Sequence, residues 1–323
     1  MTRRVLVTGA SGFVARALLR AGRAGFEYVA ASRKVLQLDG IEWRRSPALS
    51  GTANWMSALE GIDAVVHLAG LAHLVTPGDS STYFAENFEG TIKLARDAKE
   101  AGVRRFVFLS SAKVLGDESG VAPLSEAAPA QPRDPYAASK LAAEQGLGNL
   151  GNSLKISILR PPLVYGPNVK ANFLALISAV ARGVPLPLAS IRNRRSLIGV
   201  DNLAAAIVAC LESPAAAGRT YHVTDGPPVS TPELIMALSA ALQRPPRLFP
   251  FPPRLLEAYG AIVGRAETVK RLTRSLELDD SAIRAELGWR AVRTFDAGIV
   301  QTVQWYRGLA EGGSNPKEAG TLR

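Results

Sequence analysis

Thiols and imidazoles are scarce in this chain, and their scarcity excludes several kinds of site. The 323 residues include one cysteine, Cys210, and three histidines. One thiol cannot form an intrachain disulfide, and the histidines do not join Asp or Glu at ligand spacing, so we predict no bound metal. Cys210 stands in the apolar run LAAAIVACLE and is predicted to be a buried small residue.

The chain also lacks an apolar run long enough to cross a bilayer. Its first residues, MTRRVLVTGASG, become polar too soon for the apolar core of a signal peptide. We therefore expect a cytoplasmic protein without a membrane partner.

The net charge of +10 raises the question of nucleic-acid binding. The lysines and arginines are scattered along the chain rather than clustered, so we predict no nucleic-acid partner. A basic background also suits a small anionic substrate such as a diphosphate, which positive walls would attract into a cleft.

Short β-branched runs alternate with helical patterns over the first half of the chain. Strands are predicted at residues 3–8, 27–32, 41–45, 64–70, 105–111 and 155–161. Helices are predicted between them at 13–24, 52–60, 82–101 and 135–149. This alternation is typical of βαβ units, so the predicted fold class is α/β with a doubly wound parallel sheet.

The composition changes after residue 162, where proline becomes frequent and the predicted helices and strands become shorter. Helices are predicted at 171–182, 201–212, 231–242, 253–264 and 295–308, and Ser230 with Glu233 forms a capping-box pattern. We expect a dinucleotide-binding domain over 1–165 with further strands from about 190–225, a smaller, interleaved α/β substrate lobe over 166–311, and a flexible tail over 312–323.

A glycine pattern joins the first predicted strand to the first helix. Gly9, Gly12 and Ala15 occupy the three small-residue positions of the dinucleotide fingerprint, which serve a tight turn, close approach of a pyrophosphate and helix packing. A purely structural strand-to-helix turn would also use glycine.

A basic turn follows the second predicted strand. An NAD site commonly places a carboxylate here for the adenosine ribose, whereas this chain has Ser32, Arg33 and Lys34, with no acidic residue before Asp39. A 2′-phosphate would meet positive charge without repulsion, so NADP(H) is the favoured cofactor and NAD(H) the alternative.

Tyr136 and Lys140 share one face of a predicted helix, at positions i and i+4. A free phenol has a pKa of about 10, and a nearby ammonium favours its ionised form. The pair therefore predicts an acid/base for hydride chemistry, with Ser110 and Ser111 as candidate second donors to the substrate oxygen. A half-buried structural tyrosine is the alternative.

Several motifs taken together are similar to one family. TGASGFVA, HLAG, Asn87 in ENFEGT, LSSAKVLG, the Tyr136 and Lys140 pair and RPPLVYGP resemble the extended short-chain dehydrogenase/reductase family over nearly the whole chain. The resemblance implies a Rossmann domain with a C-terminal nucleotide-sugar lobe, Tyr136 as acid/base, Lys140 on the nicotinamide ribose and Ser111 on the substrate oxygen. The implied cofactor site comprises Gly9, Ser11, Gly12, Phe13, Val14, Ser32, Arg33, Lys34, Leu68, Ala69, Gly70, Asn87, Tyr136, Lys140 and Pro161.

The residues after Ser111 separate reaction classes within that family. Dehydratases of the family carry Asp-Glu where this chain has Ala112-Lys113, so dehydration is not expected. The closest resemblance is to bacterial nucleotide-sugar 4-epimerases and UDP-4-keto-6-deoxy-HexNAc 4-reductases of O-antigen synthesis. The basic turn favours an NADPH-dependent reductase over an epimerase that retains NAD, and a catalytically silent NADP-sensing protein is a third hypothesis.

The resemblance also implies a UDP-sugar site and a homodimer. Asn172 and Arg195 match positions that hold the uridine or diphosphate in related epimerases, and Arg271 is a weaker second phosphate ligand. His73 and Lys113 are further candidates for substrate contact. Relatives commonly dimerise through helices like those predicted at 82–101 and 135–149.

Overall fold

A seven-stranded parallel sheet forms the centre of the molecule. The structure, a computed structural model, describes residues 2–22, 24–72, 80–151 and 153–311. The strand order is β3-β2-β1-β4-β5-β6-β9, so the order reverses between β1 and β4, where doubly wound sheets bind ligands. The strands are β1 (Arg3–Thr8), β2 (Phe26–Ser32), β3 (Glu42–Arg45), β4 (Ala64–His67), β5 (Arg105–Leu109), β6 (Lys155–Arg160) and β9 (Arg219–His222).

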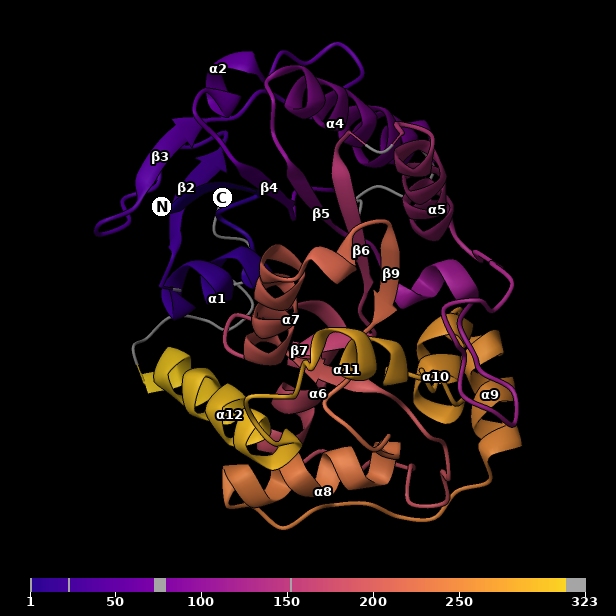
Figure 1. Cartoon of the computed structure of the whole chain (residues 1–323). Coiled ribbons are helices and arrows are strands. Elements are labelled where there is room, and N and C mark those ends of the chain that lie inside the picture. The colour runs from indigo at the N-terminus through magenta and orange to yellow at the C-terminus, as the bar shows by residue number, and fades with distance from the viewer. Residues whose placement is uncertain (1, 23, 73–79, 152, 312–323) are drawn as a thin grey trace.

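Helices cover both faces of this sheet, which is why its central strands are apolar on both sides. Side chains of α1 (Phe13–Ala21) and α7 (Val200–Glu212) pack on one face. The opposite face is covered by α2 (Met56–Leu59), α4 (Gly90–Glu100) and α5 (Pro135–Gly148), as Figure 1 shows. The predicted α/β class and doubly wound sheet are confirmed.

The helix predicted at 82–101 is continuous, but its hydrogen-bonding pattern changes along its length. It starts with α3 (Ser80–Tyr83), continues as a π-helical turn η1 (Phe84–Glu89) and ends as α4. Such a turn accommodates an extra residue and frequently marks a functional site. Apolar periodicity cannot reveal it, because the outer turns keep the ordinary helical pattern.

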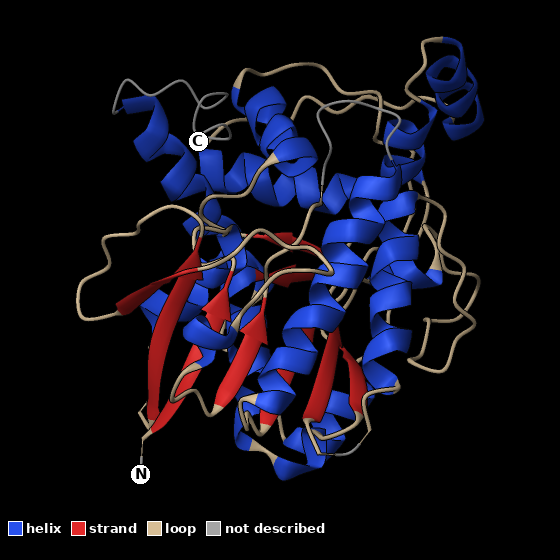
Figure 2. Ribbon diagram, turned by 90° about the horizontal axis from the view of Figure 1, so that it is seen from above, coloured by secondary structure: helices blue, strands red, loops and turns tan. Residues whose placement is uncertain are grey.

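The C-terminal half gathers beyond one end of the sheet, as Figures 1 and 2 show. Most of its helices share a core that includes Phe173, Ile177, Leu238 and Val303, whereas α11 (Ser281–Leu287) places Ile283 in the core of the main sheet. No helix in the described part of the chain is long and apolar enough to cross a bilayer. The helices are α6 (Ala171–Ala181), α8 (Thr231–Leu242), α9 (Pro253–Ile262), α10 (Ala266–Thr273), α11 (Ser281–Leu287) and α12 (Phe295–Glu311).

Several predicted elements of this half differ in the structure. The capping box of Ser230 and Glu233 is present at the start of α8. Two short helices, α10 and α11, fall where no helix was predicted. The strands expected from about 190–225 divide, because β9 joins the main sheet whereas β8 (Leu197–Gly199) pairs with β7 (Leu163–Tyr165) in a separate one. Residues 312–323 lie outside the described residues.

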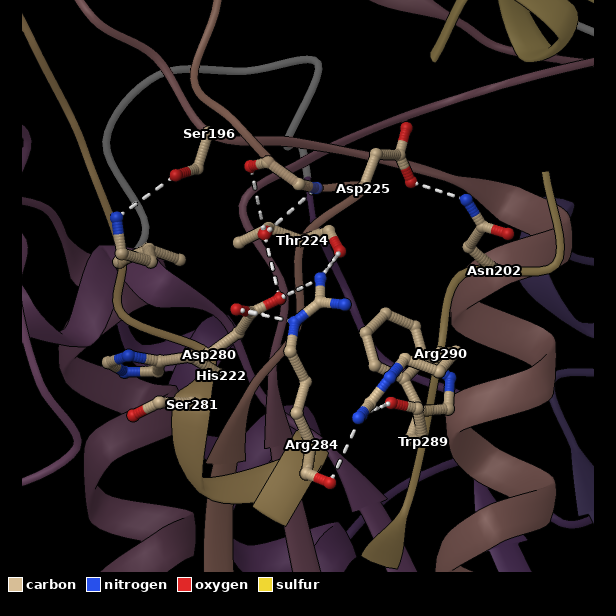
Figure 3. Close-up of polar contacts among 12 residues, drawn as sticks. Ser196, Asn202, His222, Thr224, Asp225, Asp280, Ser281, Arg284, Trp289 and Arg290 are labelled. Atoms are coloured by element: carbon tan, nitrogen blue, oxygen red, sulfur yellow. Dashed lines mark hydrogen bonds and ion pairs between the residues drawn. The ribbon is translucent and has the colours of Figure 1, made fainter. Parts of the chain in front are cut away.

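Polar side chains join the lobe to the carboxyl end of β9 (Figure 3). Asp225 accepts hydrogen bonds from the Tyr165 hydroxyl at 2.5 Å, Asn202 Nδ2 at 2.6 Å and the Gly199 amide at 2.8 Å. Arg284 pairs with Asp280 at 2.7 Å, and Asp280 also accepts from the Thr224 hydroxyl. The network fixes the lobe against the sheet edge.

Candidate active site

The glycine loop between β1 and α1 touches the neighbouring β4 loop. Gly9 has φ +67°, and a Cβ there would lie 2.8 Å from Ala69 Cα. At Gly12 a Cβ would lie 2.9 Å from the Gly9 carbonyl oxygen, whereas Ala15 is buried against the sheet. Each small residue is therefore required by the backbone geometry.

The start of α1 can receive a phosphate. Ser11 and Gly12 are exposed, Phe13 and Val14 are half-buried, and no side chain caps the first amides. Free amides and the positive end of the helix dipole attract anions. The loop thus fits the pyrophosphate of a dinucleotide on conformational and electrostatic grounds.

The turn after β2 carries the predicted positive charge. The Ser32 hydroxyl donates to the Lys34 carbonyl at 2.5 Å and accepts from Trp43 Nε1 at 2.9 Å, so the start of the turn is fixed. Arg33 and Lys34 are exposed. This geometry leaves both cations free to meet an anion at the carboxyl end of β2.

Asn87, on the π-helical turn, holds the loop after β4. Its Oδ1 accepts from the Leu71 amide at 2.7 Å, and its Nδ2 donates to the Leu71 carbonyl at 2.9 Å and to Ser139 Oγ at 3.1 Å. The adjoining Leu68 and Ala69 are half-buried, and Gly70 is exposed at φ +158°. A Cβ at Gly70 would lie 2.9 Å from Asn87 Oδ1. Asn87 thus shapes the predicted cofactor loop through its backbone.

His67, at the end of β4, is a buried residue packed within the sheet. Its ring nitrogens contact Thr8 Oγ1 at 2.7 Å and Thr91 Oγ1 at 3.0 Å. Burial, and secondarily the charge of Lys140, lowers the pKa of His67 to about 3, so the ring is neutral. No group of three or more metal-ligating side chains occurs within the described ranges.

The two serines after β5 have different environments. Ser110 is buried and donates to Glu144, which also binds Arg160. Ser111 is half-buried, and its hydroxyl accepts from the Lys113 amide at 3.3 Å. The Pro161 carbonyl accepts from the Ala112 amide at 2.9 Å and so holds this segment beside β6. Ser111 is the hydroxyl left available to a substrate.

Tyr136 lies in the first turn of α5 and meets Ser111. Burial raises the pKa of Tyr136 to about 12, Asp134 and Tyr83 act in the same direction, and hydrogen bonding with the Ser111 side chain lowers it. The prediction that the Lys140 ammonium draws this pKa down is wrong, because burial outweighs other influences. The phenol is protonated at neutral pH and can donate its proton.

Lys140 stands one helical turn further and is buried. Its ammonium donates to the Leu109 carbonyl at 2.9 Å and lies 4.7 Å above the Phe108 ring centroid. A Cβ at Gly70 would lie 3.4 Å from Nζ, so the ammonium also faces the β4 loop. Burial lowers the pKa of Lys140 to about 8, and the charge of Glu144 acts in the opposite direction.

Asp134, which motif comparison did not single out, organises the start of α5. It caps the helix by accepting from the Ala137 amide at 2.7 Å, and it forms an ion pair with Lys113. Lys113 also approaches Asp117 at 3.9 Å and lies 6.0 Å above the Tyr136 ring centroid. The DP pair before a helical pattern is the sequence signal that could have identified this cap.

The predicted substrate residues gather only in part. Arg195 donates to the Arg274 carbonyl at 2.9 Å, and burial, reinforced by the charge of Arg271, lowers the pKa of Arg195 to about 10. The pKa of Asp134 is lowered although burial opposes it, chiefly by hydrogen bonds from Lys113 and the Ala137 amide and least by the charge of Arg271. Asn172 is exposed on the first turn of α6, and His73 lies outside the described residues. Two adjacent cations are suited to an anionic group.

Comparison with known proteins agrees with this geometry. Residues 5–224 match the model of a family described as the NAD dependent epimerase/dehydratase family. The UDP-glucose 4-epimerase of Vibrio cholerae is 35% identical over 314 residues, which cover 94% of this chain and 95% of that protein. The UDP-glucose 4-epimerase of Mycolicibacterium smegmatis is 28% identical, with coverage of 95% and 100%.

A solved structure gives the same result. MoeE5 in complex with UDP-glucose and NAD superposes with a TM-score of 0.75 and 26% identity, covering 95% of this chain and 99% of that one. The two relatives are named as epimerases of UDP-glucose, and the solved structure holds UDP-glucose and NAD, which supports an enzyme acting on sugar nucleotides rather than a silent sensor. The chain belongs to the NAD dependent epimerase/dehydratase family.

Proposed function

We propose that this chain is an enzyme that transfers hydride at C4 of a UDP-sugar, with Tyr136 moving the proton at the C4 oxygen. The observation that carries the proposal is the hydrogen bond of Ser111 with Tyr136 after β5, one helical turn from Lys140, whose ammonium faces the same β4 loop that Gly9 touches. Ser111 would orient the C4 oxygen, and Lys140 would hold the nicotinamide ribose. The bound nicotinamide would supply or accept the hydride.

Two kinds of reaction are candidates, reduction and epimerisation at C4, and each is supported by its own observation. The exposed Arg33 and Lys34 after β2 favour NADP(H) and hence a 4-ketoreductase of a UDP-4-keto-6-deoxy-hexosamine, as do the protonated phenol and its neighbouring serine. Similarity to the Vibrio cholerae enzyme favours a UDP-hexose or UDP-HexNAc 4-epimerase that retains NAD. Arg195 and Arg271 would bind the diphosphate in both cases.

Two incubations separate these candidates. A reductase consumes NADPH when UDP-4-keto-6-deoxy-HexNAc is added, seen as loss of nicotinamide absorbance. An epimerase instead interconverts the gluco and galacto forms of UDP-glucose or UDP-GlcNAc with no net cofactor consumption, seen by NMR. Absence of both activities would refute the proposal.

A pair of variants tests the cofactor assignment. Replacing Arg33 and Lys34 by Ala is expected to raise KM for NADPH about tenfold and to leave KM for NADH unchanged, because only NADPH has the 2′-phosphate. Arg20→Ala, which removes an exposed arginine at the far end of α1, is the matched control. Equal effects on both cofactors would contradict an NADP preference.

A further inference from the structure

The α9–α10 hairpin places its large apolar side chains on the outside. On α9, Leu255, Tyr259 and Ile262 are 57%, 62% and 82% exposed, and their spacing of four and three residues aligns them on one side. The side of α9 that faces α10 carries the small residue Gly260. It packs so closely on Val269 of α10 that a Cβ at Gly260 would lie 2.6 Å from Val269 Cγ2. This arrangement is the reverse of an ordinary surface helix, whose apolar side faces the core.

The apolar side continues into the preceding segment. A cavity of about 330 Å³ is lined by Pro187, Phe249, Phe251, Leu256 and Tyr259. Phe249 is itself exposed, as is Val263 at the end of the helix. We define the outer face of the hairpin as Phe249, Leu255, Tyr259, Ile262 and Val263 together with this cavity.

Exposed arginines adjoin the outer face along the chain. None of them forms an ion pair with another described residue; they are Arg247, Arg254 and Arg265, which stand within two positions of Phe249, Leu255 and Val263. The acidic residue of α9, Glu257, is half-buried, accepts from Thr273 at 2.6 Å and lies 3.5 Å from Arg274, and Glu267 of α10 pairs with Lys270. The apolar outer face is thus flanked by cations that have no acidic partner among the described residues.

We propose that the outer face of the hairpin docks on an anionic lipid bilayer. Aliphatic and aromatic side chains would enter the boundary between headgroups and acyl chains, with the Tyr259 hydroxyl at the level of the headgroups, while the arginines meet lipid phosphates. The hairpin lies at the edge of the molecule, away from the main sheet (Figure 1), so it can reach a flat surface.

This binding is peripheral, so it needs no spanning helix. The lack of a long apolar run in the sequence argues against a spanning segment, whereas binding at the bilayer surface needs only exposed apolar side chains and cations. The rim of a single charge sign favours lipid over a second copy of the chain, because the same arginines would face one another across a symmetric interface.

Vesicle flotation tests the proposal with the full chain. The protein is expected to float with vesicles containing phosphatidylglycerol, to float much less with pure phosphatidylcholine, and to be released by salt. Ile262→Asp and Tyr259→Ser should abolish most of the binding, and Arg254→Gln with Arg265→Gln should weaken it by about tenfold or more.

The controls are exposed residues elsewhere. Val121→Asp adds the same charge at an exposed valine, and Arg20→Gln removes an arginine from α1; both should bind like the wild type. Circular dichroism confirms folding of every variant. Failure of the wild type to float with anionic vesicles, or unchanged binding of Ile262→Asp, overturns the proposal. A lipid-free dimer that Ile262→Asp dissociates would likewise overturn it in favour of self-association.

Discussion

The buried Tyr165 and the half-buried Tyr136 both have raised pKa values, yet their surroundings differ. The hydroxyl of Tyr165 donates to the carboxylate of Asp225, whose oxygens also accept from the Gly199 amide. The same carboxylate accepts from Asn202, as Figure 3 shows. Among the described residues, the half-buried phenol of Tyr136 has the hydroxyl of Ser111 as its hydrogen-bonding partner, a group that can itself accept or donate. A shifted pKa therefore does not by itself mark a catalytic group. Hydrogen-bonding capacity left open toward a substrate distinguishes the two sites.

The largest expected effect is on activity at the open site. Tyr136→Phe removes the proton donor and should lower kcat by a factor of about 10² to 10⁴ while the thermal unfolding midpoint stays near that of the wild type. Steady-state kinetics and a thermal melt measure both quantities. Tyr165→Phe is the matched control, since it should lower stability and spare kcat. A Tyr136→Phe enzyme of full activity would end the assignment of this residue as the acid/base.

The opposite result, a loss of stability without a loss of activity, is expected for the network around Asp225. Asp225→Ala leaves the Tyr165 hydroxyl, the Asn202 amide and the Gly199 amide without their acceptor, and should lower the free energy of unfolding by about 3 kcal/mol. Asp225→Asn should be milder, because burial raises the pKa of Asp225 and so already disfavours its charge. Denaturant titration measures both. Strong loss of kcat in the folded Asp225→Ala protein would contradict the assignment of the Asp225 network to stability and of Tyr136 to catalysis.

Lys140 sharpens the comparison through pH. Its pKa is lowered to about 8 by burial, and the ammonium is the form that can bind a ribose hydroxyl as a donor. Activity is therefore complete below this pKa and lost as pH rises through it. The free-enzyme profile of kcat/KM should fall about tenfold per pH unit above about 8. The same fall of kcat/KM with pH should be seen in the control variant Asp225→Asn. A profile that stays flat up to about pH 10, near the ordinary pKa of lysine, would argue against Lys140 as the group that binds the ribose.

The smallest effect is expected at Lys113. Its ion pair with Asp134 holds the first turn of α5, where Tyr136 lies, so Lys113→Gln should lower kcat about fivefold and leave KM for the sugar nucleotide unchanged. Lys113→Arg keeps the positive charge and should restore part of the loss. If KM rises instead, Lys113 contacts substrate, which is the other role considered for it in the sequence.

The sheet could be predicted from the sequence because its signals are local. The apolar runs of β1, β2, β5 and β6 end within two residues of their predicted limits, and the burial of Cys210 follows from the run that contains it. The Gly9 and Gly12 loop could be placed for the same reason, since turn and helix start are contiguous in sequence. The predicted roles of the surrounding site residues remain predictions.

The features that sequence reasoning missed depend on distant partners. The short β7 and β8 pair across more than 30 residues, and α10 and α11 have only eight and seven residues, too few for a clear periodicity. The ion pair of Lys113 with Asp134 spans a loop whose path no local rule predicts. The raised pKa of Tyr136 reflects burial by the folded protein, whereas the i, i+4 spacing reports only the neighbouring lysine.

The late position of α7 and β9 in the chain has a consequence for synthesis. Leu203 and Ile207 of α7 complete the core beside Val5 and Leu18, and β9 pairs with β6 at the edge of the sheet. A nascent chain that has emerged only to residue 165 therefore exposes one apolar face and an unpaired strand edge. This core cannot be completed on the ribosome before α7 and β9 have emerged, and its members Ile283 and Trp289 emerge later still. Translation pauses or truncations before residue 222 should therefore leave an aggregation-prone intermediate.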